Sequence, residues 1–170
     1  MNYAQIRDMD IVNGEGIAVS LFVQGCFHHC EGCFNQSTWD FTGGKRWTKE
    51  VEDEFVELCK RDYVSCVSLL GGEVFDQHMP TIVNLLKRLK KEVGKPIWVW
   101  TGYLITDDAV NRYAEALRYI DYLVDGEFDI NKTNTRLRLR GSSNQRIWHI
   151  RDLGLTNGIE NVTEEKGWRK

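Results

Sequence analysis

The sequence predicts a single α/β domain with a largely parallel sheet. Its 170 residues are about the length of one domain, and with only two prolines and no Ser/Gly-rich linker the chain shows no boundary. Short apolar runs that end in glycine alternate with helical segments of about 10–15 residues, which is typical of βαβ units. Four such units are too few for a closed barrel, which needs about 250 residues. Two architectures are therefore compatible with the sequence, an open, partial βα barrel and a doubly wound sheet.

The first half of the chain supplies two strand–helix units. "SLFVQG" (20–25) is a buried strand that ends in glycine, and Thr48 is the expected N-cap of the helix that follows. "VSCVSLLGG" (64–72) is apolar and β-branched, which predicts the second strand. The next helix has Pro80 in its first turn, where proline is tolerated, and an apolar face opposite "KRLKKE".

The second half continues the pattern and then loses it. "PIWVWTG" (96–102) is the third predicted strand, a helix begins near Thr106, and "DYLVDG" (121–126) is the fourth strand. "RLRLR" (136–140) alternates as an edge strand or a solvated hairpin does, and "RIWHI" (146–150) predicts one more strand.

From Gly154 the chain turns polar. We therefore expect one domain over residues 1–153 and a loosely held polar tail over residues 154–170.

Composition indicates a cytoplasmic globular protein. A hydrophobic content of 42% with 28% charged residues is ordinary, and a net charge of -3 gives no general attraction to nucleic acid or to an anionic membrane. No run approaches the length of a membrane span, and "MNYAQIRDMD" has no signal-peptide core. We expect neither a nucleic-acid nor a membrane partner.

Three of the five cysteines, Cys26, Cys30 and Cys33, lie in one short loop. A disulfide framework would have an even, dispersed set in an oxidising compartment, so metal or redox chemistry is favoured. Three thiolates on a cubane iron–sulfur cluster leave one iron without a protein ligand, and an open position distinguishes a catalytic metal site from a structural one. A zinc site completed by His28 or His29 is the alternative, although both histidines are expected to be solvated loop residues.

The other unusual residues each follow a strand: "GGEVF" the second, "TGY" the third and "DGEF" the fourth. Because the carboxyl ends of parallel strands meet at one edge, we expect a single pocket with the cysteines at one side. Gly71 and Gly72 lack Cβ atoms, so a ligand can approach their backbone, and Glu73 is suited to holding an ammonium group. A strand-ending turn is the alternative. Cys59 falls on the apolar face of a predicted helix and Cys66 inside a predicted strand, and both are expected to be buried.

The pattern Cys26-x3-Cys30-x2-Cys33 after the first strand, with "GGE" after the second, resembles the radical S-adenosylmethionine enzymes. Within that superfamily the chain resembles the branch that activates anaerobic ribonucleoside-triphosphate reductases. The strings that carry this resemblance, over roughly residues 1–151, are "DIVNGEG", "LFVQGC", "CEGCFNQSTW", "WVWTGY", "LVDGEF" and "RGSSNQR".

The resemblance implies a partial, open βα barrel of the radical S-adenosylmethionine type. Cys26, Cys30 and Cys33 would ligate three irons of a [4Fe-4S] cluster, and S-adenosyl-L-methionine would bind the fourth iron. Gly71, Gly72 and Glu73 would line its methionine part, with Glu73 near the amino group. Reductive cleavage would give a 5′-deoxyadenosyl radical.

The implied partners are the large subunit of the anaerobic ribonucleoside-triphosphate reductase, which would receive a glycyl radical, and a low-potential electron donor such as flavodoxin or ferredoxin. "RLRLR" is compatible with a docking surface for either, and equally with a solvated strand. The alternatives are an activase of another glycyl-radical enzyme, a radical enzyme acting on a small molecule, and a zinc-binding interaction module.

The chain departs from the superfamily just before the third cysteine. An aromatic residue is common there, whereas this chain has Gly32. Backbone atoms of Gly32, Cys33 and Phe34 would still meet the adenine, and the Phe34 ring would supply a stacking face. Asp125, at the end of the fourth strand, is a candidate for the ribose hydroxyls, with a turn-forming aspartate as the alternative.

Overall fold

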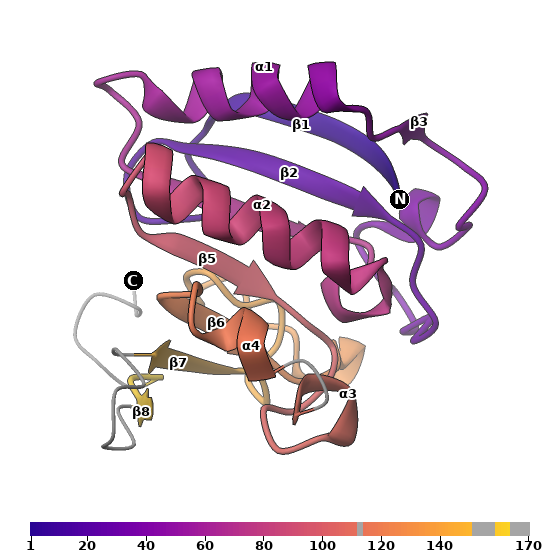
Figure 1. Ribbon diagram of the computed structural model, residues 1–170. Coiled ribbons are helices and arrows are strands. Elements are labelled where there is room, and N and C mark those ends of the chain that lie inside the picture. The colour runs from indigo at the N-terminus through magenta and orange to yellow at the C-terminus, as the bar shows by residue number, and fades with distance from the viewer. Residues whose placement is uncertain (112–113, 151–158, 164–170) are drawn as a thin grey trace.

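Four parallel strands form the centre of the sheet in the computed structural model, which describes residues 1–111, 114–150 and 159–163 (Figure 1). They are β2 (Ala18–Gln24), β4 (Cys66–Gly71), β5 (Ile97–Trp100) and β6 (Tyr122–Asp125), and each pairs in parallel with the next. Each lies within or across a predicted strand. The predicted α/β class and its parallel core are therefore confirmed.

Antiparallel strands extend both edges of this core. On one side lie β1 (Asn2–Asp10) and β3 (Lys45–Arg46), and on the other β7 (Arg146–Ile150) and β8 (Ile159–Asn161). Within the described ranges the sheet has eight strands in the order β3-β1-β2-β4-β5-β6-β7-β8. Of these edge strands only β7 was predicted.

Helices connect the parallel strands. Helix α1 (Lys49–Lys60) begins after Thr48, whose hydroxyl accepts the N–H of Val51 at 3.4 Å, and α2 (Met79–Glu92) carries proline in its first turn, both as predicted. The helix predicted from Thr106 is described as two short pieces, α3 (Asp108–Asn111) and α4 (Ala114–Leu117), with residues 112–113 outside the described ranges. None of the helices described has the length and apolar composition that a membrane crossing requires.

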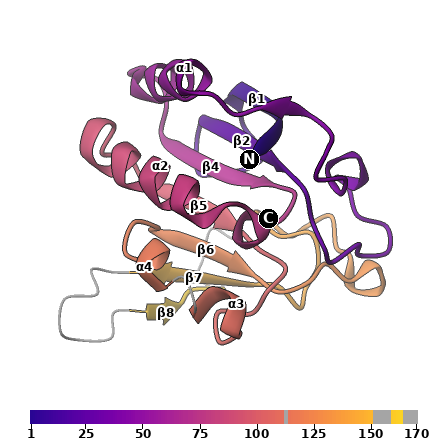
Figure 2. The ribbon, with the colours of Figure 1, turned by 45° about the vertical axis from the view of Figure 1, so that its right-hand side comes forward.

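The winding of the chain decides between the two predicted architectures. The parallel strands follow one another in sequence order, whereas a doubly wound sheet reverses its direction at a switch point. Because such crossovers are right-handed, constant direction places the connecting helices on one face, where α1 and α2 lie together (Figures 1 and 2). The doubly wound alternative is wrong for the described chain. The partial barrel stays a prediction.

The main core lies between this helical layer and the sheet. It combines alternate residues of the parallel strands with the inner faces of α1 and α2, for example Leu21, Leu69, Phe55, Ile82 and Leu86, all fully buried. Burial of such side chains contributes on the order of 1.5–3 kcal/mol each.

Two loops, rather than helices, cover the opposite face of the sheet. In the first, the carbonyl oxygens of Asn13 and Glu15 accept from the side chains of Ser68 and Cys66 on β4. In the second, Leu139 accepts the indole N–H of Trp100 at 2.8 Å. Residues 136–140 belong to this second loop, so the predicted edge strand or hairpin there is wrong. Of the two leucines in this segment, Leu139 packs against the buried cluster on this face of the sheet, and Leu137 lines the cavity described below.

The C-terminal segment is described only over residues 159–163. There Ile159–Asn161 forms β8, which pairs with β7, and Val162 and Thr163 are buried, so this part is held by the sheet rather than loose. The remainder of the predicted tail, 154–158 and 164–170, lies outside the described residues. The domain boundary after residue 153 stays a prediction.

The end of β4 packs tightly against the start of the cysteine loop. Gly72 donates its N–H to Val23 at 2.9 Å, Glu73 donates to Gly25 at 2.9 Å, and a Cβ at Gly72 would overlap the Gly25 carbonyl oxygen. Only glycine therefore fits at position 72 without moving the loop.

Gly72→Ala should lower the free energy of unfolding by about 2–3 kcal/mol, the cost of overpacking against fixed backbone. Gly94→Ala is the matched control, because Gly94 has a left-handed φ of 68° with nothing near its absent Cβ and should cost only about 1 kcal/mol. Urea denaturation of the metal-free proteins measures both. Equal losses would contradict the tight contact at Gly72.

Candidate functional site

One cavity of about 310 Å³ lies at the carboxyl ends of the parallel strands, within the size range of small-molecule sites. Its wall combines the cysteine loop after β2, the glycine–glutamate turn after β4, Trp100 to Gly102 after β5, and Gly126 and Phe128 after β6. The predicted convergence of four strand ends on one pocket is confirmed.

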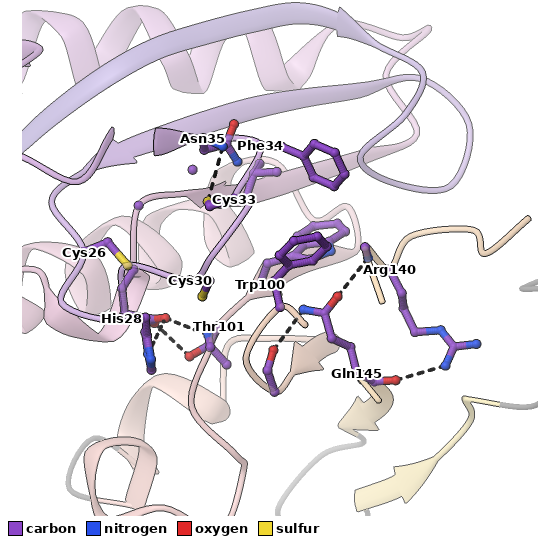
Figure 3. Close-up of a pocket in the computed structure, with 18 of the residues that line it drawn as sticks. Cys26, His28, Cys30, Cys33, Phe34, Asn35, Trp100, Thr101, Arg140 and Gln145 are labelled. Atoms are coloured by element: carbon purple, nitrogen blue, oxygen red, sulfur yellow. Dashed lines mark hydrogen bonds and ion pairs between the residues drawn. The ribbon is translucent and has the colours of Figure 1, made fainter. Parts of the chain in front are cut away.

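The three clustered cysteines line one side of this cavity. Cys26, Cys30 and Cys33 are half-buried free thiols, and Figure 3 shows them across the cavity from Trp100 and Gln145. Cys59 and Cys66 are instead fully buried in the fold and line no part of it, as predicted. The loop therefore presents three sulfurs to one cavity.

Burial favours the protonated, metal-free thiols of Cys26 and Cys30. It raises the pKa of Cys26, and it raises the pKa of Cys30 to about 11. Since thiolates are the form that binds metal, iron binding must displace these protons, and the gain in iron–sulfur bonding must exceed that cost. The Cys33 sulfur accepts the backbone N–H of Asn35 at 3.3 Å.

Glu73 forms a fixed, buried negative charge in the cavity wall. Only 2% exposed, it accepts from the Phe75 N–H at 2.9 Å, the Thr101 hydroxyl at 2.8 Å and the Gly102 N–H at 2.8 Å. Its Oε2 also lies 3.5 Å from His28 Nε2. The carboxylate is thus oriented by the second and third strand ends together. Its predicted contact with an ammonium group stays a prediction.

The glycines before Glu73 line the cavity, but they are glycines because of contacts inside the protein. A Cβ at Gly71 would lie 2.8 Å from the Cβ of Phe22, and the one at Gly72 would overlap Gly25. The expectation that a ligand approaches their backbone stays a prediction beside this packing requirement.

His28 is not the solvated loop residue that was expected. Its ring contacts Tyr103 with centroids 4.4 Å apart, its Nε2 lies 3.5 Å from Glu73 Oε2, and the Glu73 carboxylate raises the pKa of His28. His29 stacks on Trp39 with ring centroids 4.7 Å apart. His29 is nevertheless exposed, as expected, whereas His28 is partly buried in the cavity wall.

The aromatic residue missing before the third cysteine has a structural explanation. Gly32 has a left-handed φ of 71°, and a Cβ there would overlap the Ile130 side chain, so this loop conformation requires glycine. Gly32 does not line the cavity, whereas Phe34 does, with its ring 5.2 Å from that of Phe128 and 76% exposed. That the Phe34 ring supplies the stacking face stays a prediction.

Asp125 lies outside the cavity wall. It is fully buried, forms a two-point ion pair with Arg146 at 2.9 and 2.6 Å, and accepts the Ile105 N–H at 2.8 Å. These bonds join β6 to β7 and to the loop after β5. A contact with ribose hydroxyls would require the ion pair to open.

Sequence reasoning missed two parts of the wall, the loop before β2 and the segment before β7. The first contributes Val12 and Asn13, and the second Leu137, Leu139 and Gln145. The Gln145 side chain accepts from Gly141 and Ser142 and donates to Gly126, which ties this segment to β6. The only signals were the strings "DIVNGEG" and "RGSSNQR", whose roles no local pattern defines.

The donor set fits a cluster better than a single ion. Among the described residues, no three His, Cys, Asp or Glu side chains converge closely enough to hold one metal ion. A single zinc requires all ligands about 2.3 Å from one point, whereas cysteines on an iron–sulfur cluster bind different irons and stand farther apart. Three separated thiols around one cavity match the second arrangement.

Comparison with known proteins agrees with this geometry. A family described as a 4Fe-4S single cluster domain matches residues 12–148, which includes all three cysteines and the rest of the cavity wall.

Relatives match nearly the whole chain. A protein from Escherichia coli (strain K12) is 41% identical over 155 residues, covering 89% of this chain and 100% of the relative. One from Enterobacteria phage T4 is 39% identical over 154 residues, covering 89% of this chain and 96% of the relative. One from Vibrio cholerae is 41% identical over 151 residues, covering 86% of this chain and 97% of the relative. All three are named anaerobic ribonucleoside-triphosphate reductase-activating protein. With its cysteine-lined cavity and this end-to-end similarity, the chain belongs to the family of anaerobic ribonucleoside-triphosphate reductase-activating proteins.

Proposed function

We propose that the chain is a radical S-adenosylmethionine activase that installs a glycyl radical on the large subunit of an anaerobic ribonucleoside-triphosphate reductase. The observation that carries the proposal is the set of three thiols from one loop, without a fourth cysteine in the wall, around a cavity that also holds Glu73. An iron without a protein ligand can take an exogenous molecule, as catalytic metal sites do.

Cys26, Cys30 and Cys33 would hold the [4Fe-4S] cluster. When bound, the cluster and S-adenosylmethionine would supply the chemistry: with one electron from a donor such as flavodoxin or ferredoxin, reductive cleavage of the sulfonium would give methionine and a 5′-deoxyadenosyl radical able to take a hydrogen atom from a glycine of the partner. Five free cysteines in the described chain suit the reducing cytoplasm in which such a centre would survive.

The chain's own residues would bind, orient and shield. Glu73, already oriented by Thr101 and Gly102, offers a negative charge for the amino group of S-adenosylmethionine. Phe34 and Trp100 supply apolar wall on two sides of the cavity. Exclusion of water protects a reactive radical from side reactions. We also propose the partial βα barrel as the architecture, since the parallel strands wind in one direction.

The proposal predicts a radical on the partner. The anaerobically reconstituted and reduced protein should, with S-adenosylmethionine, generate a doublet glycyl-radical EPR signal on the reductase large subunit, because the open iron position permits sulfonium cleavage beside the docked glycine. The matched control omits S-adenosylmethionine and should give no signal.

Methionine release without a glycyl signal would instead indicate a radical enzyme with another target. A protein that reconstitutes with zinc alone, and not with iron and sulfide, would contradict the proposal outright.

Cluster ligands and buried cysteines should respond differently to substitution. Cys30→Ala should abolish S-adenosylmethionine cleavage, because Cys30 lines the cavity, whereas Cys66→Ala should leave it largely intact and cost about 1 kcal/mol of stability. Iron and sulfide content, methionine release and thermal unfolding measure both variants. Equal loss of cleavage in the two would contradict the assignment of ligands.

A further inference from the structure

The short turn Val74–Asp76 and the residue after it hold the peptide on either side of Cys26. Asp76 Oδ2 accepts the N–H of Phe27 at 3.0 Å, and Gln77 Nε2 donates to the carbonyl of Gly25 at 3.1 Å. Gly25 and Phe27 are the neighbours of Cys26 in the chain. The first cysteine of the loop is thus fixed from both sides by two consecutive side chains.

Both side chains are themselves anchored. The other oxygen of Asp76 accepts the hydroxyl of Tyr103 at 2.7 Å, which joins the turn to the loop after β5. Gln77 is buried and donates a second bond to the Glu73 carbonyl at 2.9 Å. Burial is the main cause that raises the pKa of Tyr103, and the hydrogen bond to the Asp76 carboxylate raises it further. The Tyr103 hydroxyl therefore stays protonated and acts as a donor.

From these contacts we infer that Asp76 and Gln77 form a clamp on the backbone that positions Cys26 to ligate the cluster. In the same inference, the negative charge of the Asp76 carboxylate lowers the cluster's reduction potential. The inference rests on the proposed function, since it requires a cluster on Cys26. Groups that hold metal ligands in place commonly contribute about 10–100-fold to metal affinity. A fixed negative charge beside a cluster disfavours its reduction, because net charge and local hydrogen bonds set the potential.

The two residues of the clamp differ in charge, so substituting each one distinguishes an effect on the position of Cys26 from an effect on the cluster's reduction potential. Asp76→Asn keeps the side-chain shape and one acceptor oxygen but removes the negative charge. It also places an N–H donor against one of the two groups that donate to Asp76, the Phe27 N–H or the Tyr103 hydroxyl. Gln77→Leu removes the N–H donors and changes no charge. Asp107→Asn is the matched control, because Asp107 also accepts a backbone N–H, from Leu104 at 2.8 Å, within its own turn.

The experiment measures two quantities on each anaerobically reconstituted full-length protein: the rate at which a chelator removes iron, and the midpoint potential of the cluster in a redox titration. Asp76→Asn and Gln77→Leu should both lose iron about tenfold faster than the wild type. Only Asp76→Asn should shift the midpoint potential, to a more positive value. Asp107→Asn should match the wild type in both.

Wild-type iron release and potential in both clamp variants would overturn the inference while the proposed function stands. A positive shift in Gln77→Leu equal to that in Asp76→Asn would overturn the electrostatic part, because a merely structural disturbance would then explain both. Should Asp76→Asn fail to fold, iron release from Gln77→Leu still decides the clamp. A wild-type chain that holds no four-iron cluster would overturn the proposed function, and the inference with it.

Discussion

A loop that offers three thiols and no fourth cysteine to one cavity is the constraint on which the rest of the site depends. Cys26, Cys30 and Cys33 belong to the cavity wall, while the other two cysteines are buried elsewhere in the fold. A closed four-ligand site would stabilise the fold and bind nothing further. Under the proposed function, the incomplete site reserves a coordination position, and the surrounding residues would orient and shield what completes it.

The fold delivers this arrangement through close contacts between strand ends. Gly72 and Glu73 bind the backbone at Val23 and Gly25, and the carboxylate of Glu73 reaches on to Thr101 and Gly102 after β5. Three consecutive strand ends are thereby fixed to one another. Because the parallel strands wind in one direction, the helices lie on one face, and loops cover the other face beside the cavity.

Local patterns predicted those parts of the molecule that local physics determines. Apolar runs stopped by glycine located β2, β4, β5 and β6, and the cysteine spacing located one side of the cavity. Pairing between distant segments could not be predicted in this way. Four features depend on a partner that the neighbouring sequence does not reveal. They are the polar strand β1, the loop over 136–140, the ion pair of Asp125 with Arg146 and the contact of His28 with Glu73.

In the proposed function, one iron of the cluster lacks a protein ligand and accepts S-adenosylmethionine. Mössbauer spectroscopy of the iron-loaded protein tests it most directly, because it resolves irons that differ in coordination. Adding S-adenosylmethionine should change the isomer shift of a single iron and leave the other three unchanged. A spectrum that is identical with and without S-adenosylmethionine would show a coordination shell already completed by the protein, and would contradict it.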